Sequence, residues 1–293
     1  MLLKIGSTGH NVKELQEFLE LHADGIFGRD THQAVEHWQS NNDLVVDGIV
    51  GPATWDAMQL ATTDESENTF NADEEPSIGI NSLPKGEYLE GPTEKEYIFI
   101  HHTAGWHNPY NTINNWGRDN RGRIATEFVI GGPSVRGNDD KYDGEIVQAF
   151  PEGGYGWHLG KNGSSYMHSH SVGIEVNNFG WIKDGKTYAG TRVDSSQIVT
   201  LDQAFRGHKT WHRYSDTQIY SLRELILYIG DRDNIDIRKG LPNLVKQKGA
   251  KAFEFNEDAY YGRVKGLWTH TNTRKDKSDM FPQPELLDML ISL

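Results

Sequence analysis

Three side chains that lie far apart in the sequence could together hold a metal ion. His101 ends an apolar run, EYIFIH, while His270 and Asp279 lie close to the C-terminus. Two neutral imidazoles and one carboxylate form a three-ligand set for a catalytic zinc ion, whose fourth position stays open to water. His270 and Asp279 are nine residues apart, so a loop must bring them to one ion, because a single helix face cannot. The chemistry open to such a set is metal-assisted hydrolysis.

A carboxylate and an ammonium group could complete this site. In the segment SVGIEV, Val172, Ile174 and Val176 share one face of an expected strand, and Glu175 lies on the other face. A carboxylate directed toward the metal could take a proton from water. The alternative is that Glu175 faces solvent on an edge strand. Lys277 lies in the same terminal loop as the candidate aspartate ligand.

A sheet is needed to position these residues. Short β-branched or aromatic runs, bounded by Gly, Pro or Asn, predict strands at residues 97–101, 126–130, 145–150 and 172–176. A helix is expected to begin after Ser215, which forms a capping-box pattern with Gln218, and to end near Gly230. Strands interleaved with helices predict an α/β domain with a mixed central sheet flanked by helices.

Composition excludes several classes of protein. The 29 Lys and Arg residues against 42 Asp and Glu residues give a net charge of −13, which argues against nucleic acid or an anionic membrane surface as a partner. The sequence has no cysteine, so disulfides, thiol nucleophiles and Cys-ligated metals are excluded. No run of about 18 apolar residues predicts membrane insertion. The N-terminus lacks the apolar region of a signal peptide.

Residues 1–60 are predicted to form a small all-α domain of three helices. Apolar residues recur at helical spacing in two segments, and a third, shorter helix is expected to begin at Pro52. An internal repeat pairs DGIFG at 24–28 with DGIVG at 47–51, an offset of 23 residues. This pattern resembles the peptidoglycan-binding module of cell-wall hydrolases; the alternative is an unrelated three-helix bundle.

The rest of the chain is expected to divide into a linker and a catalytic domain. Residues 61–84 begin with an acidic segment whose composition is typical of a solvated linker. The catalytic domain is then expected at residues 85–293. Within it, residues 231–262 show no sustained periodicity and are interpreted as an insertion.

Four segments of this second domain resemble the zinc amidase family that includes phage lysozyme-like amidases, bacterial N-acetylmuramoyl-L-alanine amidases and animal peptidoglycan recognition proteins. They are IHHTAG, GWHLG, SVGIE and the terminal loop in which a histidine is followed by K-x-D. The resemblance implies one zinc ion per chain, with the following roles: His101, His270 and Asp279 as ligands, Glu175 as catalytic base, Lys277 beside the scissile carbonyl, and His158 as a substrate-binding pocket residue. The family more often has Pro-Gly after the third ligand, where this chain has Met-Phe-Pro, so Asp276 competes with Asp279 for that role.

The resemblance implies hydrolysis of the amide bond between N-acetylmuramic acid and L-alanine in peptidoglycan. A wall-binding module on the same chain agrees with this substrate, and we expect a monomeric phage endolysin that stays in the host cytoplasm until it is released to the wall. A bacterial remodelling amidase is the alternative setting. Two other functions stay open at this point: a non-catalytic peptidoglycan recognition protein, and a zinc endopeptidase that cuts within the stem peptide. Several aromatic residues, Trp181 among them, could line a substrate groove or belong to the core.

Overall fold

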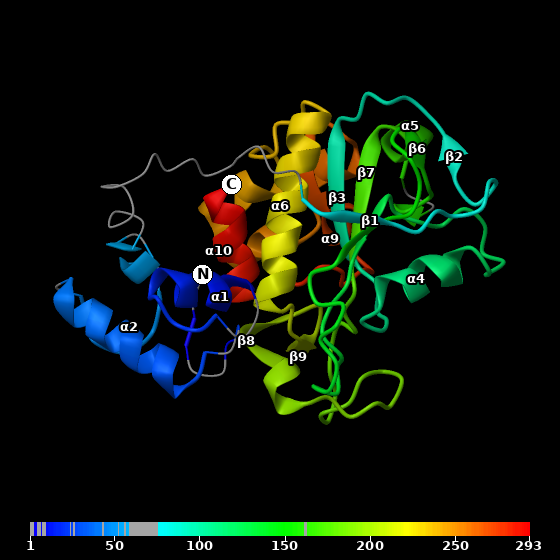
Figure 1. Cartoon of the computed structure of the whole chain (residues 1–293). Helices are drawn as coiled ribbons and strands as arrows, with labels where there is room; N and C mark the ends of the chain where they lie inside the picture. The colour runs from blue at the N-terminus through cyan, green and yellow to red at the C-terminus, as the bar shows by residue number, and fades with distance from the viewer. Residues whose placement is uncertain are drawn as a thin grey trace. The chain divides into compact units, whose positions relative to one another are not determined.

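The computed structural model describes residues 3–4, 7, 10–23, 25, 27–42, 44–51, 53–55, 57–58, 76–160 and 163–293. The chain divides into two compact units, residues 1–74 and 75–293 (Figure 1). The second unit therefore begins earlier than the expected boundary at residue 85. The reason is strand β1 (Ile78–Ile80), which pairs with a strand of the central sheet. Most of the predicted linker lies outside the described residues.

The first unit contains the two predicted amphipathic helices. Helix α1 spans His10–Phe18 and α2 spans Arg29–Asn41, and residues 53–55 and 57–58 are also helical. Pro52, where the third helix was expected to begin, lies outside the described residues, as do Asp24 and Ile26 of the repeat. The helices enclose a core of Leu3, Val12, Leu15, Phe27, Val35, Val50 and Met58.

Two buried glutamines give the internal repeat its structural meaning. Gln16 accepts a hydrogen bond from the Gly25 amide and donates one to the Thr31 hydroxyl. Gln39 makes the same pair of bonds, with the Gly48 amide and the Thr54 hydroxyl. Each partner in the second set lies 23 residues after its counterpart, so the repeat is a repeated turn held by a helix glutamine.

The second unit is built on a six-stranded mixed sheet, which confirms the predicted fold class. The strand order is β1-β5-β4-β7-β3-β10. The strands after β1 are β3 (Tyr97–His102), β4 (Phe128–Ile130), β5 (Ile146–Gln148), β7 (Ser171–Val176) and β10 (Gly266–Thr269). Only the β4–β5 pair is antiparallel among these neighbours. Strands β1 and β10 were not predicted from the sequence.

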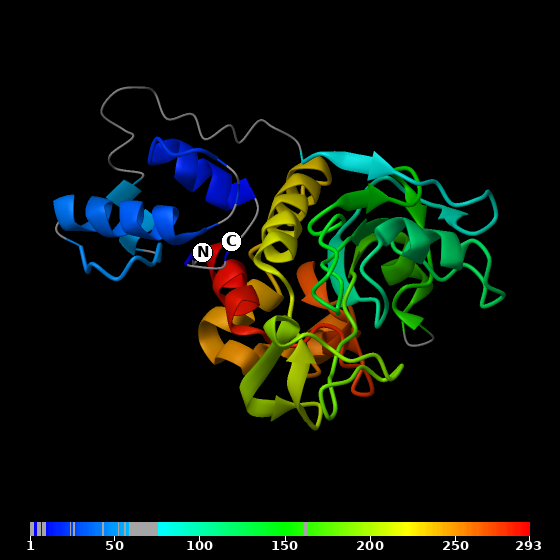
Figure 2. The same ribbon diagram turned by 60° about the horizontal axis from the view of Figure 1, so that its bottom comes forward.

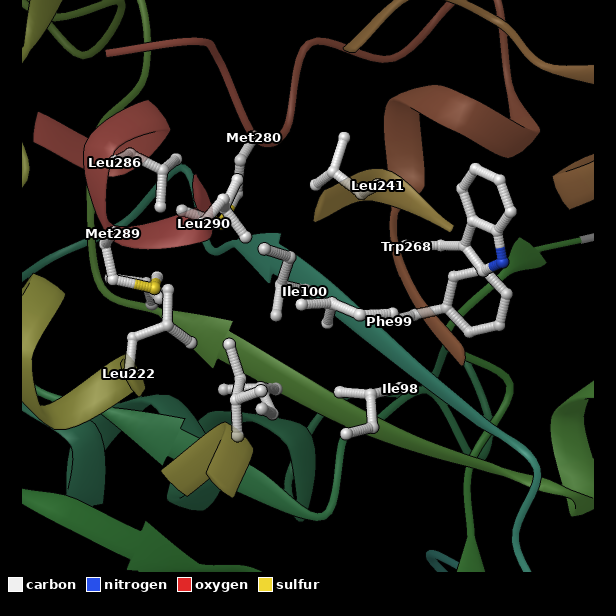
Figure 3. Close-up of a cluster of buried hydrophobic side chains, with 14 of the residues drawn as sticks. Ile98, Phe99, Ile100, Leu222, Leu241, Trp268, Met280, Leu286, Met289 and Leu290 are labelled. Atoms are coloured by element: carbon white, nitrogen blue, oxygen red, sulfur yellow. The ribbon is translucent and has the colours of Figure 1, made fainter. Parts of the chain in front are cut away.

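Helices cover the two faces of the sheet. Helices α6 (Asp216–Arg232), α7 (Leu241–Lys248) and α10 (Pro284–Ser292) bury apolar side chains against one face (Figures 1 and 3). Leu222, Leu241 and Leu290 meet Ile98 and Ile100 there. Helix α4 (Pro109–Trp116) packs on the other face, where Ile113 joins Val129 and Val147. Along β4 the alternation of strand side chains places Val129 on the opposite face from Phe128 and Ile130.

Helix α6 begins as predicted. Ser215 accepts a hydrogen bond from the Gln218 amide, and the Gln218 side chain bonds back to the Ser215 amide, completing the capping box. The helix ends at Arg232, two residues after the predicted end. Residues 231–262, interpreted as an insertion, contain α7, a 3-10 turn at Gly249–Phe253 and α8 (Glu257–Tyr260). Leu241, Val245 and Phe253 from this segment are part of the main core.

Smaller elements surround the sheet. A hairpin of β8 (Ile198–Phe205) and β9 (His208–His212) projects from the second unit, and Figure 2 shows it beside the C-terminal loop that precedes α10. The remaining elements are β2 (Leu89–Glu90), β6 (Gly154–Tyr155), α5 (Ser165–Ser169), a 3-10 turn at Ser195–Gln197 and α9 (His270–Thr273). Among the described residues, no helix combines the length and apolar character that crossing a bilayer requires.

Candidate metal centre

The sheet brings His101 and His270 to the same edge. His101 lies near the end of β3, and His270 follows the last residue of β10, which pairs with β3 in parallel, Thr269 opposite Ile100. The carboxyl ends of parallel strands are where open α/β sheets place their ligands. Asp279 comes from the loop before α10. One ligand atom from each of the three residues lies within 4.8 Å of the others.

Both histidine rings meet the same carboxylate oxygen. The His270 Nδ1 atom is 2.9 Å from Asp279 Oδ2, and the His101 Nδ1 atom is 3.4 Å from it. The two imidazole rings are 4.6 Å apart between centroids. The competing carboxylate, Asp276, lies elsewhere: it forms an ion pair with Arg274, and its side chain is 64% exposed. The geometry therefore groups Asp279, and not Asp276, with the histidines.

His158 lies behind His101 and not in an open pocket. Its Nδ1 atom is 3.0 Å from His101 Nε2, and its Nε2 atom is 2.8 Å from the Ser171 hydroxyl. Both ring nitrogens of this buried residue therefore have partners within the protein. A hydrogen bond on the second nitrogen of a metal-binding histidine fixes the ring's tautomer and orientation. Ser171 was not identified from the sequence, although it shares the period-two face of Glu175 in β7.

Glu175 lies next to His101 in the sheet. The two residues are directly opposite each other in the β3–β7 pair, so their side chains share a face. Strand β7 lies between β4 and β3, so the alternative of an edge strand is wrong. The Oε2 atom is buried and has no hydrogen-bond partner among the described residues. Burial raises the pKa of Glu175 well above its usual range, and the charge of Asp279 adds to this shift while Lys277 opposes it.

Burial and charge also set the protonation of two candidate ligands, His101 and Asp279. Burial lowers the pKa of His101 to about 4, so its imidazole is neutral at pH 7. Burial opposes ionisation of Asp279, but the neighbouring rings of His270 and His101 hold the pKa of that carboxyl well below its usual range. A neutral imidazole and an ionised carboxylate are the states that a metal ion binds. These residues therefore fit a zinc ion in donor type, protonation and spacing.

The neighbouring His102 takes no part in this cluster. Its side chain lies on the opposite face of β3, where its Nδ1 atom is 2.7 Å from the Tyr214 hydroxyl and its ring packs edge-on against Phe281. Adjacent strand residues point to opposite faces, so the sheet separates the side chains of these two neighbouring histidines. His102 and Tyr214 are both buried in the layer between the sheet and the C-terminal helices.

The fold and the cluster define a class of α/β proteins with a candidate metal centre at the carboxyl edge of a mixed sheet. Two families match the chain. Residues 8–58 match a putative peptidoglycan binding domain, and residues 91–277 match N-acetylmuramoyl-L-alanine amidase. The second match covers more than half of the chain, which therefore belongs to the N-acetylmuramoyl-L-alanine amidase family. The chain thus joins a domain of this family to an N-terminal region that matches a putative peptidoglycan binding domain.

Solved structures resemble separate parts of the chain. A Burkholderia AP3 phage endolysin is 36% identical over 22% of this chain and 27% of its own, with a TM-score of 0.21. The catalytic domain of XlyA is 16% identical over 74% of this chain and 95% of its own, with a TM-score of 0.39. PlyL is 14% identical over 69% of this chain and 86% of its own, also with a TM-score of 0.39. The chain thus spans about a quarter of the AP3 endolysin. No curated protein matches it.

Proposed function

We propose that this chain hydrolyses the amide bond between N-acetylmuramic acid and L-alanine in peptidoglycan, using one zinc ion held by His101, His270 and Asp279. The observation that carries the proposal is the convergence of three ligand atoms within 4.8 Å, next to a buried Glu175 Oε2 atom that has no hydrogen-bond partner among the described residues. Membership of the amidase family supports the choice of bond. The donor set of two imidazoles and one carboxylate supports the choice of zinc.

The protein's own groups have distinct tasks in this reaction. When bound, a zinc ion supplies positive charge that acidifies water and polarises the amide carbonyl. Glu175 is the general base that takes a proton from the attacking water and returns it to the departing amine. Burial raises the pKa of Glu175 above its usual range, which makes this carboxylate a stronger base toward water. Lys277 places an ammonium group where negative charge develops on the carbonyl oxygen.

For His158, the hydrogen bonds favour a positioning role over the substrate contact that the resemblance implies. His101 can bind a metal through Nδ1 only if its other nitrogen carries the proton, and that N–H then donates to His158 Nδ1. His158 in turn donates from Nε2 to the Ser171 hydroxyl. This chain of donors holds His101 in the tautomer that zinc requires.

The domain pairing supports a lytic role. A peptidoglycan-binding domain beside an amidase domain holds the enzyme on its insoluble substrate, which raises the local concentration of cleavable bonds. We propose that the protein is a phage endolysin that acts as a monomer on the host cell wall after release from the host cytoplasm. The net charge of −13 gives no electrostatic attraction to an anionic envelope, so wall affinity rests on the binding domain.

Three measurements test the proposal. Dye-labelled cell wall should be solubilised by the protein, should resist it after chelation, and should be solubilised again when zinc is returned. Mass spectrometry of the products should find intact stem peptides with a free L-alanine amine. The His270→Ala variant should lose bound zinc relative to the unaltered protein. Wall binding without release would identify a recognition protein, and cleavage within the stem peptide would identify an endopeptidase; either result overturns the proposal.

A further inference from the structure

A cavity of about 390 Å³ lies beside the candidate metal centre. Its lining consists of Trp181, Arg206, His208 and residues 275–278, and so includes Lys277. The cavity therefore shares a residue with the proposed catalytic site. Its other wall comes from the β8–β9 hairpin, which was not predicted from the sequence.

The β8–β9 hairpin, which forms one side of the cavity, is joined by hydrogen bonds to the loop before α10. The Arg206 guanidinium donates to the carbonyl oxygens of Lys275 and Thr271 at 3.1 and 3.3 Å. The Trp181 indole and the His208 imidazole stack with 4.5 Å between centroids and 5° between planes, forming a flat surface. The hairpin and the loop that carries Lys277 are thus held together by hydrogen bonds, which keeps the cavity at a fixed place relative to the site.

The charge of the lining is mainly positive. Arg206, Lys275 and Lys277 are cations, and the single acid, Asp276, is paired with Arg274. Arg206 has an ion pair with Glu254 at 3.3 Å, but the Glu254 side chain is 55% exposed, so solvent screens this contact. No carboxylate among the described residues lies within ion-pair distance of Lys277 or Lys275. Cationic side chains therefore line this cavity, although the net charge of the whole protein is −13.

We infer that this cavity binds a free carboxylate of the stem peptide, and that Arg206 makes the enzyme selective for acidic stems. The inference rests on the proposed function. In that substrate the lactyl carboxyl of N-acetylmuramic acid is consumed in the scissile amide, and the sugars are otherwise neutral. Negative charge therefore lies on the peptide side. A stem whose second residue is a glutamate linked through its side chain has a free α-carboxylate, about 7 Å from the scissile bond in an extended chain.

The test compares two soluble muropeptides that differ only at this group, one with the free α-carboxylate and one with the carboxamide. We expect the unaltered enzyme to have a kcat/KM about tenfold higher for the carboxylate, the size of a charge-assisted hydrogen bond. Arg206→Gln should bring the ratio close to one, and Arg206→Lys should keep most of it. Because Arg206 also holds the terminal loop, Lys275→Gln is a second variant at an exposed position, and it should lower the ratio in part.

Lys209→Gln is the matched control. It removes one positive charge from the same hairpin, at an exposed position outside the cavity lining. The ratio of kcat/KM between the two muropeptides should therefore equal that of the unaltered enzyme. In 0.5 M NaCl the preference should shrink, because salt screens exposed charge pairs. Equal hydrolysis of both muropeptides by the unaltered enzyme, or an equal loss of preference in Arg206→Gln and Lys209→Gln, would overturn the subsite while leaving the amidase assignment intact. Cleavage of neither muropeptide at the amide would contradict the proposed function itself.

Discussion

In the proposed mechanism, Glu175 is the residue whose chemistry separates hydrolysis from binding. Its carboxylate lies against His101 across the β3–β7 pair, and its buried Oε2 atom has no partner among the described residues. Leaving a carboxylate in that state is costly unless a cation or a transferable proton compensates for it. A role in stability does not account for this arrangement, whereas the proton transfer that we propose for Glu175 does.

Glu175→Gln should lower kcat by about 100-fold or more, since a positioned general base contributes about 10² to 10⁴. Glutamine keeps the size of the side chain but cannot accept the proton from water. Zinc content measured by atomic absorption should stay at the level of the unaltered protein, because Glu175 is not among the three clustered ligands. Glu152→Gln, at an exposed position in the same unit, should leave both quantities unchanged. Full activity in Glu175→Gln would remove this residue from the mechanism.

His158 affects the metal through His101. Replacing it with phenylalanine removes the acceptor for the His101 Nε2 proton and leaves that nitrogen buried without a partner. Loss of such an outer partner weakens metal binding by about 10 to 100-fold. Competition with a fluorescent chelator measures this as a higher Kd for zinc, and Ser171→Ala should shift it in the same direction by less. His107→Phe is the control; an equal Kd in His158→Phe and the control would contradict the positioning role.

The sequence allowed candidate site residues to be selected, but it did not show which neighbouring residues hold them in place. His101, His270 and Asp279 could be selected because their types and loop positions suit zinc and match a family pattern. The choice between Asp279 and Asp276 needed coordinates, since both lie in one polar loop, three residues apart. Ser171 was missed because a serine at a strand start has many ordinary roles, and only the fold brings it to His158.

At the scale of elements, the start of α6 holds a carboxylate in a partly buried position. The Asp143 Oδ1 atom accepts a hydrogen bond of 2.5 Å from Ser215, the N-cap residue of the helix. Burial raises the pKa of Asp143 to about 6, even though the hydrogen bonds from Ser215 and Thr217 oppose this shift. The folded protein thus holds a proton on Asp143 between about pH 4 and 6, where the unfolded chain has released it.

The difference in proton binding between the folded and unfolded states determines whether stability rises or falls with pH. Because the folded state binds more protons in that window, the free energy of unfolding falls as pH rises from about 4 to 6, by up to about 3 kcal/mol for this group. Asp143→Asn cannot ionise and still accepts the bond from Ser215. Its Tm should therefore exceed that of the unaltered protein at pH 7.5 and converge with it near pH 4. Asp202→Asn, at an exposed position in the same unit, should keep a constant Tm difference from the unaltered protein over this pH range. A variant less stable at pH 7.5 would contradict the argument.

Elements with a strong local signal could be predicted, and the others could not. The capping box identified α6, and alternating or apolar runs identified β3, β4, β5 and β7 within a few residues. Strand β10 is four residues long and buried throughout, so it shows no alternation. The β8–β9 hairpin has a register shift between Thr200 and Phe205 that interrupts its pattern. Residues 231–262 form helices too short to show a period.

At the scale of the whole molecule, the proposed function divides the work on an insoluble substrate between two units. The first unit matches a peptidoglycan-binding domain, and its fold depends on the repeated contacts of Gln16 and Gln39. The second unit contains the whole metal cluster. Chemistry on a small soluble substrate therefore needs only the second unit, whereas attack on intact wall gains from tethering.

Removal of residues 1–60 should lower the rate of dye release from labelled wall by about tenfold or more, since a second attachment point raises the effective concentration of substrate by at least that factor. Hydrolysis of a soluble muropeptide should stay within about twofold of the full chain, because no ligand of the cluster is removed.

Gln39→Leu provides an independent variant that keeps the chain length. It leaves the amides of Asp47 and Gly48 without their acceptor, which destabilises the first unit by about 1 to 3 kcal/mol per buried group. Its wall activity should fall more than its muropeptide activity, as measured by the ratio of the two rates. An equal loss on both substrates, in either variant, would show that the first unit serves the fold of the second and not its attachment to the wall.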